Sequence, residues 1–197
     1  LAQIIGIIAQ IVVGGISVLT HLNPFVVGAH FLISIILIST TLSLRQRMLE
    51  APRVSLQPLT KKLSLVVLAI SFLVISLGVI VTGSGPHAGD VMAKRFHIDP
   101  RTISWLHADS VIALICLSFA LFLLIKSTES PEVRHSAQRA ISIFLFICLG
   151  QGFIGYTQYF SGLPELLVGA HLLGATLVWA SVWNYAFSTK VLDVRKN

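Results

Sequence analysis

Six long apolar stretches limit this chain to structures that can lie within a lipid bilayer. They cover residues 1–22, 25–44, 63–82, 101–125, 140–160 and 166–187. A helix needs about 20 apolar residues to cross the hydrocarbon core, and in lipid its backbone groups must be satisfied internally. Only 11% of the residues are charged, about half the share found in an average soluble domain. The sequence therefore predicts an all-α integral membrane protein with six visible transmembrane helices.

The last two of these stretches repeat the first two. Residues 10–32 and 151–173 align without a gap at an offset of 141, and each segment contains Val-Gly-Ala-His. The two middle helices have no counterparts in this sequence. We therefore expect two further helices before Leu1, which would complete an eight-helix protein made of two four-helix repeats.

The repeat also divides the chain into four parts. The expected parts are the last two helices of the first repeat (1–44), a basic cytoplasmic linker (45–62), a complete second repeat (63–189) and a cytoplasmic tail (190–197). Eleven of the fourteen Lys and Arg residues lie in the linker, in the connection between the fourth and fifth helices, and in the tail. Positively charged loops stay in the cytoplasm. We expect a multi-pass plasma-membrane protein with a cytoplasmic C-terminus, and a net charge of +6 that reports topology and gives no support for nucleic-acid binding.

Three histidines are predicted to share one depth in the membrane. His30, His107 and His171 each follow a proline by six or seven residues, and proline is preferred at the first helical position. At a rise of 1.5 Å per residue, each histidine would lie about 10 Å along its helix. Asp99 is a good N-cap for the helix of His107. Such residues usually face a bundle interior, either as packing contacts between helices or as ligands of haem iron; their shared depth favours haem.

The neighbours of His171 favour a flat macrocycle over a compact ion. Gly174 and Ala175 lie three and four positions further along, on the same helix face, where a porphyrin plane could approach; packing of small residues between helices is the alternative. No carboxylate and histidine cluster of the kind that binds zinc or two irons is visible in the helices. The same ambiguity applies to four glycines in the repeated helices: Gly14, Gly15, Gly152 and Gly155.

The other polar residues leave alternatives open. Gln10 and Gln151 recur in the repeat and either bond across helices or bind a ligand. Asp109 either orients a water or reaches the interface, and we favour the interface. The cations on the outer side would pair with haem propionates or with lipid headgroups: Lys94, Arg95 and Arg101. The remaining histidines are expected at the surface or in loops: His21, His87, His97 and His135.

Several motifs also resemble a known family. They are Val-Thr-Gly-Ser-Gly-Pro-His-Ala-Gly-Asp at 81–90, Leu-His-Ala-Asp at 106–109, Gly-Tyr-Thr-Gln-Tyr at 155–159, Gly-Ala-His at 169–171, and in the first helices Gly-Gly-Ile-Ser-Val-Leu-Thr at 14–20, Leu-Asn-Pro at 22–24 and His-Phe-Leu at 30–32. Together they resemble bacterial heme A synthase along essentially the whole chain. The resemblance implies two four-helix halves and an enzyme that oxidises a methyl group of heme O to the formyl group of heme A for terminal oxidases.

By this resemblance, His107 and His171 would be the axial ligands of haem b in the second half, and His30 would belong to the first-half haem site, where heme O is oxidised. The metal of both sites would be haem iron. The family's catalytic glutamate lies in its first two helices, which this chain does not contain, so the catalytic residues here are unknown. The implied partners are lipid, the haem substrate, and heme O synthase or oxidase assembly proteins.

Two other functional classes use the same features. A di-haem membrane protein that only transfers electrons would need the same histidines at the same spacing. A transporter built from repeated bundles is the third class, but 140–160 and 166–187 lack the helix break expected in the middle of the membrane.

Overall fold

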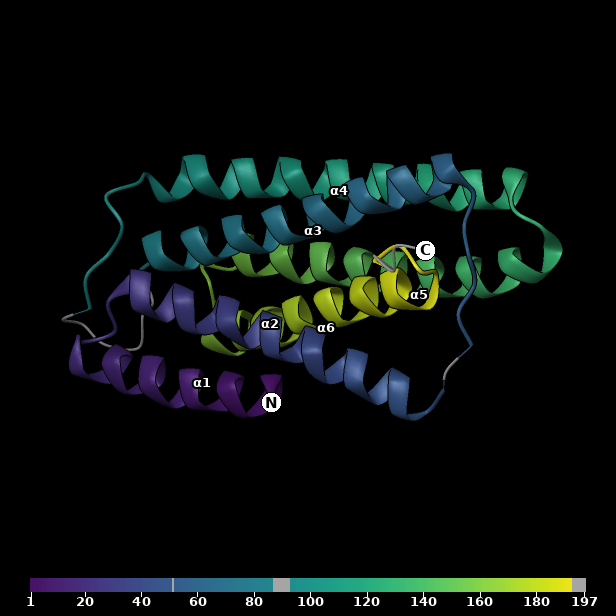
Figure 1. Cartoon of the computed structure of the whole chain (residues 1–197). Coiled ribbons are helices and arrows are strands. Elements are labelled where there is room, and N and C mark those ends of the chain that lie inside the picture. Colours follow the sequence, from purple (N-terminus) through teal and green to yellow (C-terminus); the bar gives the residue numbers. More distant parts are fainter. Residues whose placement is uncertain (51, 87–92, 193–197) are drawn as a thin grey trace.

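The computed structural model describes residues 1–50, 52–86 and 93–192, and within that part all regular secondary structure is helical (Figure 1). The helices are α1 (Ala2–Leu19), α2 (Pro24–Met48), α3 (Pro58–Ser84), α4 (Pro100–Thr128), α5 (Pro131–Phe160) and α6 (Glu165–Ser188). Each of the six is long and apolar enough to cross a membrane. The predicted class, an all-α protein with six apolar spans, is confirmed.

Helices α2 to α6 are longer than the apolar stretches that predicted them, whereas α1 ends three residues before its stretch does. α5 begins at Pro131, well before residue 140, and α3 begins at Pro58, before residue 63. Hydropathy marks the part of a helix that fits the hydrocarbon core, whereas the backbone stays helical until a residue favours its end. The predicted linker 45–62 is consequently helical at both ends, and only 49–57 connects α2 to α3.

Polar caps and prolines set the starts of the helices. The side chain of Asn23 accepts a backbone N–H two residues further on at 3.0 Å. Asp99 caps α4 as predicted, accepting the backbone N–H of Thr102 at 2.8 Å and its hydroxyl at 2.6 Å. Four helices, α2 to α5, carry proline in their first turn. In α6 the prediction was one residue off, because Pro164 is the N-cap and the helix begins at Glu165.

Helices α3 to α6 form a four-helix bundle. α3 packs on α4 and α6, and α5 packs on the same two helices, so α4 and α6 are diagonal to each other. α2 packs on α3 and α6, whereas among the described residues α1 packs only on α2 (Figure 1). The α1–α2 hairpin therefore lies against one side of the bundle, on α3 and α6.

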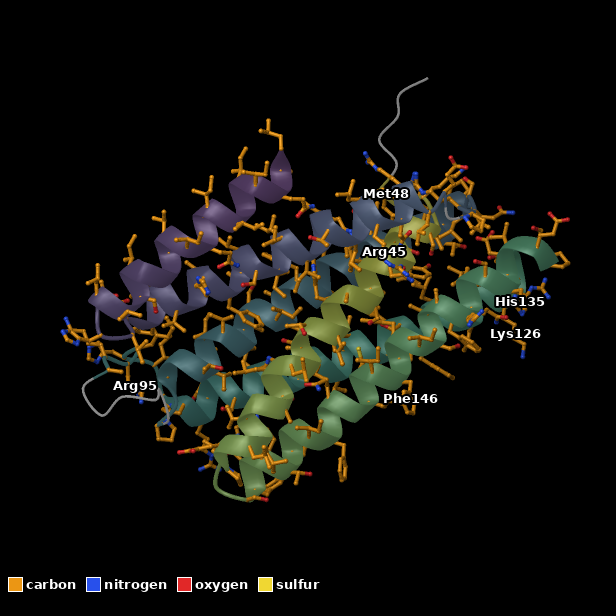
Figure 2. All side chains as sticks on the ribbon, turned by 90° about the horizontal axis from the view of Figure 1, so that it is seen from below. Arg45, Met48, Arg95, Lys126, His135 and Phe146 are labelled. Carbon is orange, nitrogen blue, oxygen red and sulfur yellow. The ribbon has the colours of Figure 1, made fainter. Side chains whose placement is uncertain are left out.

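The most tightly packed part of the bundle lies toward one end. Figure 2 places Arg45, Lys126 and His135 at this end and Arg95 at the opposite one; we call it the basic end. Fully buried side chains on this side include Phe144, and the buried hydroxyls of Ser64 and Tyr185 hydrogen-bond at 2.7 Å. The densely packed core therefore lies closer to the basic end than the three histidines do.

The two repeated hairpins share their turn conformation. His21 and Leu22, between α1 and α2, have φ values of 52° and 55°, and Gly162 and Leu163, between α5 and α6, have φ values of 76° and 61°. Both pairs lie in the left-handed region, which L-residues other than glycine rarely adopt. The repeat found in the sequence is therefore also a repeat of backbone conformation.

The repeat-equivalent helices α2 and α6 pack on each other through unlike residues. The indole N–H of Trp179 donates to the hydroxyl of Ser39 at 2.7 Å, and that of Trp183 donates to Ser43 at 2.9 Å. These bonds lie in the dense part of the structure and join the α1–α2 hairpin to the bundle. We call this contact the indole–hydroxyl seam.

Candidate functional site

Each predicted histidine packs on a glycine of the helix before it. A β-carbon added to Gly78 of α3 would lie 3.2 Å from Cε1 of His107, and one added to Gly155 of α5 would lie 3.2 Å from Cε1 of His171. A β-carbon at either position would crowd the imidazole, which would have to shift by a few tenths of an ångström. The two glycines therefore fix how far each ring stands from the adjacent helix.

The first hairpin repeats this arrangement. A β-carbon on Gly14 of α1 would lie 3.2 Å from Cε1 of His30 on α2. Gly15 and Gly152, which the sequence could not separate from it, have no atoms within 4 Å of the position of an added β-carbon. Gly14 and Gly155 thus lie beside histidines, whereas Gly15 and Gly152 do not.

The three imidazoles share an unsatisfied ring nitrogen. Nδ1 of His30, His107 and His171 is buried and has no hydrogen-bond partner among the described residues. Leaving a buried polar atom unpaired is costly, and each such atom requires an explanation. Histidines that only joined helices would be expected to use this nitrogen, so the pattern favours rings held in place for another ligand.

His107 and His171 come from the two diagonal helices of the bundle, α4 and α6. These two helices do not pack on each other, since each packs on α3 and α5. Diagonal helices in a bundle project side chains toward a common centre, where bundle cofactors are usually bound. The described residues contain no group of three or more His, Cys, Asp or Glu for a bare metal ion. Two imidazoles suit a haem, whose porphyrin supplies the other iron ligands.

Helices α5 and α6 bury fewer residues beside His171 than they do toward the basic end. In α5 no residue beyond Cys148 is buried, and in α6 none before Gly174 is buried. Toward the basic end, by contrast, side chains such as Phe144 and Val182 are fully enclosed. The buried core of α5 and α6 is thus concentrated toward the basic end.

The expectation that Gly174 presents a bare face to haem is not supported. The space of a β-carbon on Gly174 is occupied by the side chain of Gln151, whose Nε2 lies 1.4 Å from that position. A porphyrin plane approaching Gly174 would therefore meet this amide first. Ala175, predicted with Gly174, is half-buried. Gly174 makes room for a polar side chain of the neighbouring helix.

The repeated glutamines behave differently in the two hairpins. Gln10 bonds across helices, since its Nε2 donates to the hydroxyl of Ser34 at 2.5 Å, and that hydroxyl donates to the carbonyl of His30 at 3.0 Å. The residue equivalent to Ser34 in the second hairpin is Ala175, which has no hydroxyl. The Oε1 atoms of both Gln10 and Gln151 are buried without a hydrogen-bond partner.

Most of the other candidate residues lie at the surface. Asp109 is exposed, and at two residues from His107 it lies about 200° around α4. Lys94 and Arg101 are exposed, while Arg95 donates from Nη2 to the carbonyl of Pro86 at 2.7 Å. The described surface histidines are exposed as expected, although His135 lies in α5 and not in a loop: His21, His97 and His135. His87 lies outside the described residues.

Gly78 is the site residue that sequence reasoning missed. It is the sole glycine of the stretch 63–82, and it has no partner in the repeat that would have drawn attention to it. The signal was available in another form, since each candidate histidine follows an apolar helix that contains glycine. The pairing became visible only when α3 and α4 were placed side by side.

Comparison with protein-family models, with curated proteins and with solved structures found no match to this chain. The functional argument therefore rests on the geometry of the histidines and on the motifs in the sequence.

Proposed function

We propose that this chain is the haem-holding part of a membrane oxidoreductase of the heme A synthase type. The α3–α6 bundle would hold haem b between His107 and His171. His30 would mark a second haem site, where a methyl group of heme O is oxidised to the formyl group of heme A.

One observation carries the proposal. His107 and His171 project from diagonal helices, each ring lies against a glycine, and each has a buried, unpartnered Nδ1. Opposed imidazoles from two helices are the ligand set of a six-coordinate haem.

The residues of this chain have distinct tasks in that function. Gly78 and Gly155 set the positions of the two rings, and the buried layer near Phe144 holds α4 and α6 at their spacing. An iron with two histidine ligands has no open position, so when bound it supplies electron transfer. A porphyrin methyl carbon has no acidic proton and no leaving group, so its oxidation needs a redox cofactor that the protein positions and tunes.

The haem assignment is tested with the purified chain in lipid nanodiscs. The wild type should bind one haem in the bundle and give a low-spin, six-coordinate optical spectrum. His107→Ala and His171→Ala should each lose that spectrum while retaining helical circular dichroism. A high-spin haem in the wild type, or full low-spin haem in both variants, would overturn the assignment.

Pigment analysis separates the enzyme from a di-haem electron carrier. Cells supplied with heme O should accumulate heme A when the full-length gene is present and not when it is deleted. A low-spin haem protein that leaves heme O unchanged would favour the electron carrier, which needs the same histidines.

The membrane setting follows the distribution of charge. Because basic residues gather at one end of the helices, with Arg45 and Lys126 among them (Figure 2), we propose that this end is cytoplasmic. The C-terminus would then be cytoplasmic and the histidines would lie toward the outer face of the plasma membrane. Heme O synthase and oxidase assembly proteins are the proposed partners.

A further inference from the structure

One stripe of α5 combines two glutamines with the glycine that supports His171. Gln151, Gly155 and Gln158 are spaced by four and three residues and so share a helix face. A β-carbon on Gly155 would lie 3.2 Å from Cε1 and 3.8 Å from Nδ1 of His171. The Oε1 atoms of both glutamines are buried without a hydrogen-bond partner. Two acceptors therefore flank the imidazole, one turn to either side.

The direction of the side chains selects one of the two acceptors. In a helix, each Cα–Cβ bond tilts toward the N-terminus of that helix. α5 begins at the basic end and α6 begins at the opposite end, so Gln158 leans back toward Gly155 while His171 leans away from the basic end, toward Gln158. The amide of Gln151 instead lies against Gly174, one turn beyond His171.

A metal-bound imidazole needs such an acceptor. When Nε2 binds a metal, Nδ1 carries the proton, and that N–H almost always donates to a carboxylate, a carbonyl or water. We propose that Oε1 of Gln158 accepts the Nδ1–H of His171 when haem is bound. Gln158 is then a positioning residue that acts through His171, and the inference rests on the proposed haem ligation.

The opposite ligand lacks an equivalent side chain. At the positions four before and three after Gly78, α3 carries Val74 and Val81 in place of the two glutamines. The iron would therefore have one ligand with a side-chain acceptor beside it, His171, and one ligand without such a side chain, His107.

The effect of Gln158 should appear in the reduction potential. An acceptor on Nδ1–H makes the imidazole more basic, which stabilises ferric over ferrous iron and lowers the potential. Gln158→Leu removes the acceptor and should favour the ferrous form about tenfold, which for one electron is a rise of about 59 mV. Gln158→Glu supplies a charged acceptor and should move the potential below that of the wild type.

Redox titration of the full chain in nanodiscs, followed by optical spectroscopy, tests the inference. Gln138→Leu is the matched control, because it removes an amide of the same helix 20 residues from Gln158 and should leave the potential unchanged. A purely structural role of Gln158 would change haem occupancy or stability in both Gln158 variants and would not give opposite shifts for Leu and Glu. If Gln158→Leu fails to retain haem, the Glu variant alone still decides the sign.

Two results would overturn the inference. In the first, the Gln158→Leu and Gln158→Glu variants both keep the reduction potential of the wild type. In the second, both variants shift that potential in the same direction. Either result leaves the haem assignment intact, since the wild type would still show a low-spin spectrum. A wild type without low-spin haem would instead reject the proposed function, and the role of Gln158 with it.

Discussion

The close contact between glycine and histidine gives the sharpest test of the site. Replacing Gly155 with alanine places a β-carbon 3.2 Å from Cε1 of His171, and the same change at Gly78 places one 3.2 Å from Cε1 of His107. Carbon atoms prefer to be about 3.5–4.0 Å apart. Each imidazole would therefore have to move by about 0.5 Å from the adjacent helix.

This displacement can be compared with what an iron ligand tolerates. Metal–ligand distances must hold to about 0.2 Å, so a shift of about 0.5 Å exceeds the tolerance by roughly twofold. Changes just outside the ligands typically cost about 10-fold to 100-fold in metal affinity. We expect Gly155→Ala and Gly78→Ala to weaken haem binding at least about tenfold, or about 1.4 kcal/mol.

Haem titration of the purified variants, followed by optical absorption, measures this loss. Gly150→Ala is the matched control, because Gly150 lies on the same helix and an added β-carbon there has no atoms within 4 Å. Alanine favours a helix over glycine by about 0.5–1 kcal/mol in both cases, so stability should not fall in the control. Haem affinity of Gly155→Ala equal to that of Gly150→Ala would refute the reasoning.

Three further predictions concern stability. His21→Gly should stabilise the protein by about 1 kcal/mol, because His21 has φ of 52°, a left-handed conformation that glycine adopts freely; an unchanged unfolding midpoint in mixed detergent would contradict this. Trp179→Phe should destabilise the protein by about 0.6 kcal/mol, the typical value of a hydrogen bond between membrane helices, since it removes the bond to Ser39. In a Ser39→Ala background the same substitution should lower the free energy of unfolding by less, and an equal loss in both backgrounds would contradict the prediction. Hydrogen bonds from the side chain and then the backbone of Thr102 lower the pKa of Asp99 below 3.8, so this carboxylate stabilises the protein above that pH and loses its effect as the pH falls through its folded pKa. Asp99→Ala should therefore lower the thermal midpoint at neutral pH, and the difference in midpoint between variant and wild type should become smaller in acid. A difference that stays constant with pH would contradict the mechanism.

The membrane class and the candidate histidines follow from local patterns, which the sequence displays directly. Apolar length predicts a span because the bilayer has a fixed thickness, and the proline offsets placed His107 and His171 at one depth. The cap at Asp99 was predictable for the same reason, since capping depends on a residue and its next three neighbours. The eight-helix repeat, the haem and the enzymatic activity stay predictions.

The contacts between helices could not be predicted from local sequence patterns. Gly174 looked bare along its own helix, and only the packing of α5 against α6 shows that Gln151 fills its space. Gly78 was overlooked because its role depends on His107, which lies across a long connection in the next helix. The starts of α3 and α5 also escaped hydropathy, because helices continue through the polar headgroup region, where hydrophobicity no longer marks them.

In the indole–hydroxyl seam, one helix supplies all the hydrogen-bond donors and the other supplies all the acceptors. Ser39 and Ser43 donate their own hydroxyl hydrogens to carbonyls of α2 at 2.9 and 2.8 Å, so they meet α6 only as acceptors, and the tryptophans can meet α2 only as donors. Two copies of α6 placed face to face would oppose donor to donor, and two copies of α2 would have no donor to exchange. The seam thus favours contact between α2 and α6 over contact between two copies of either helix.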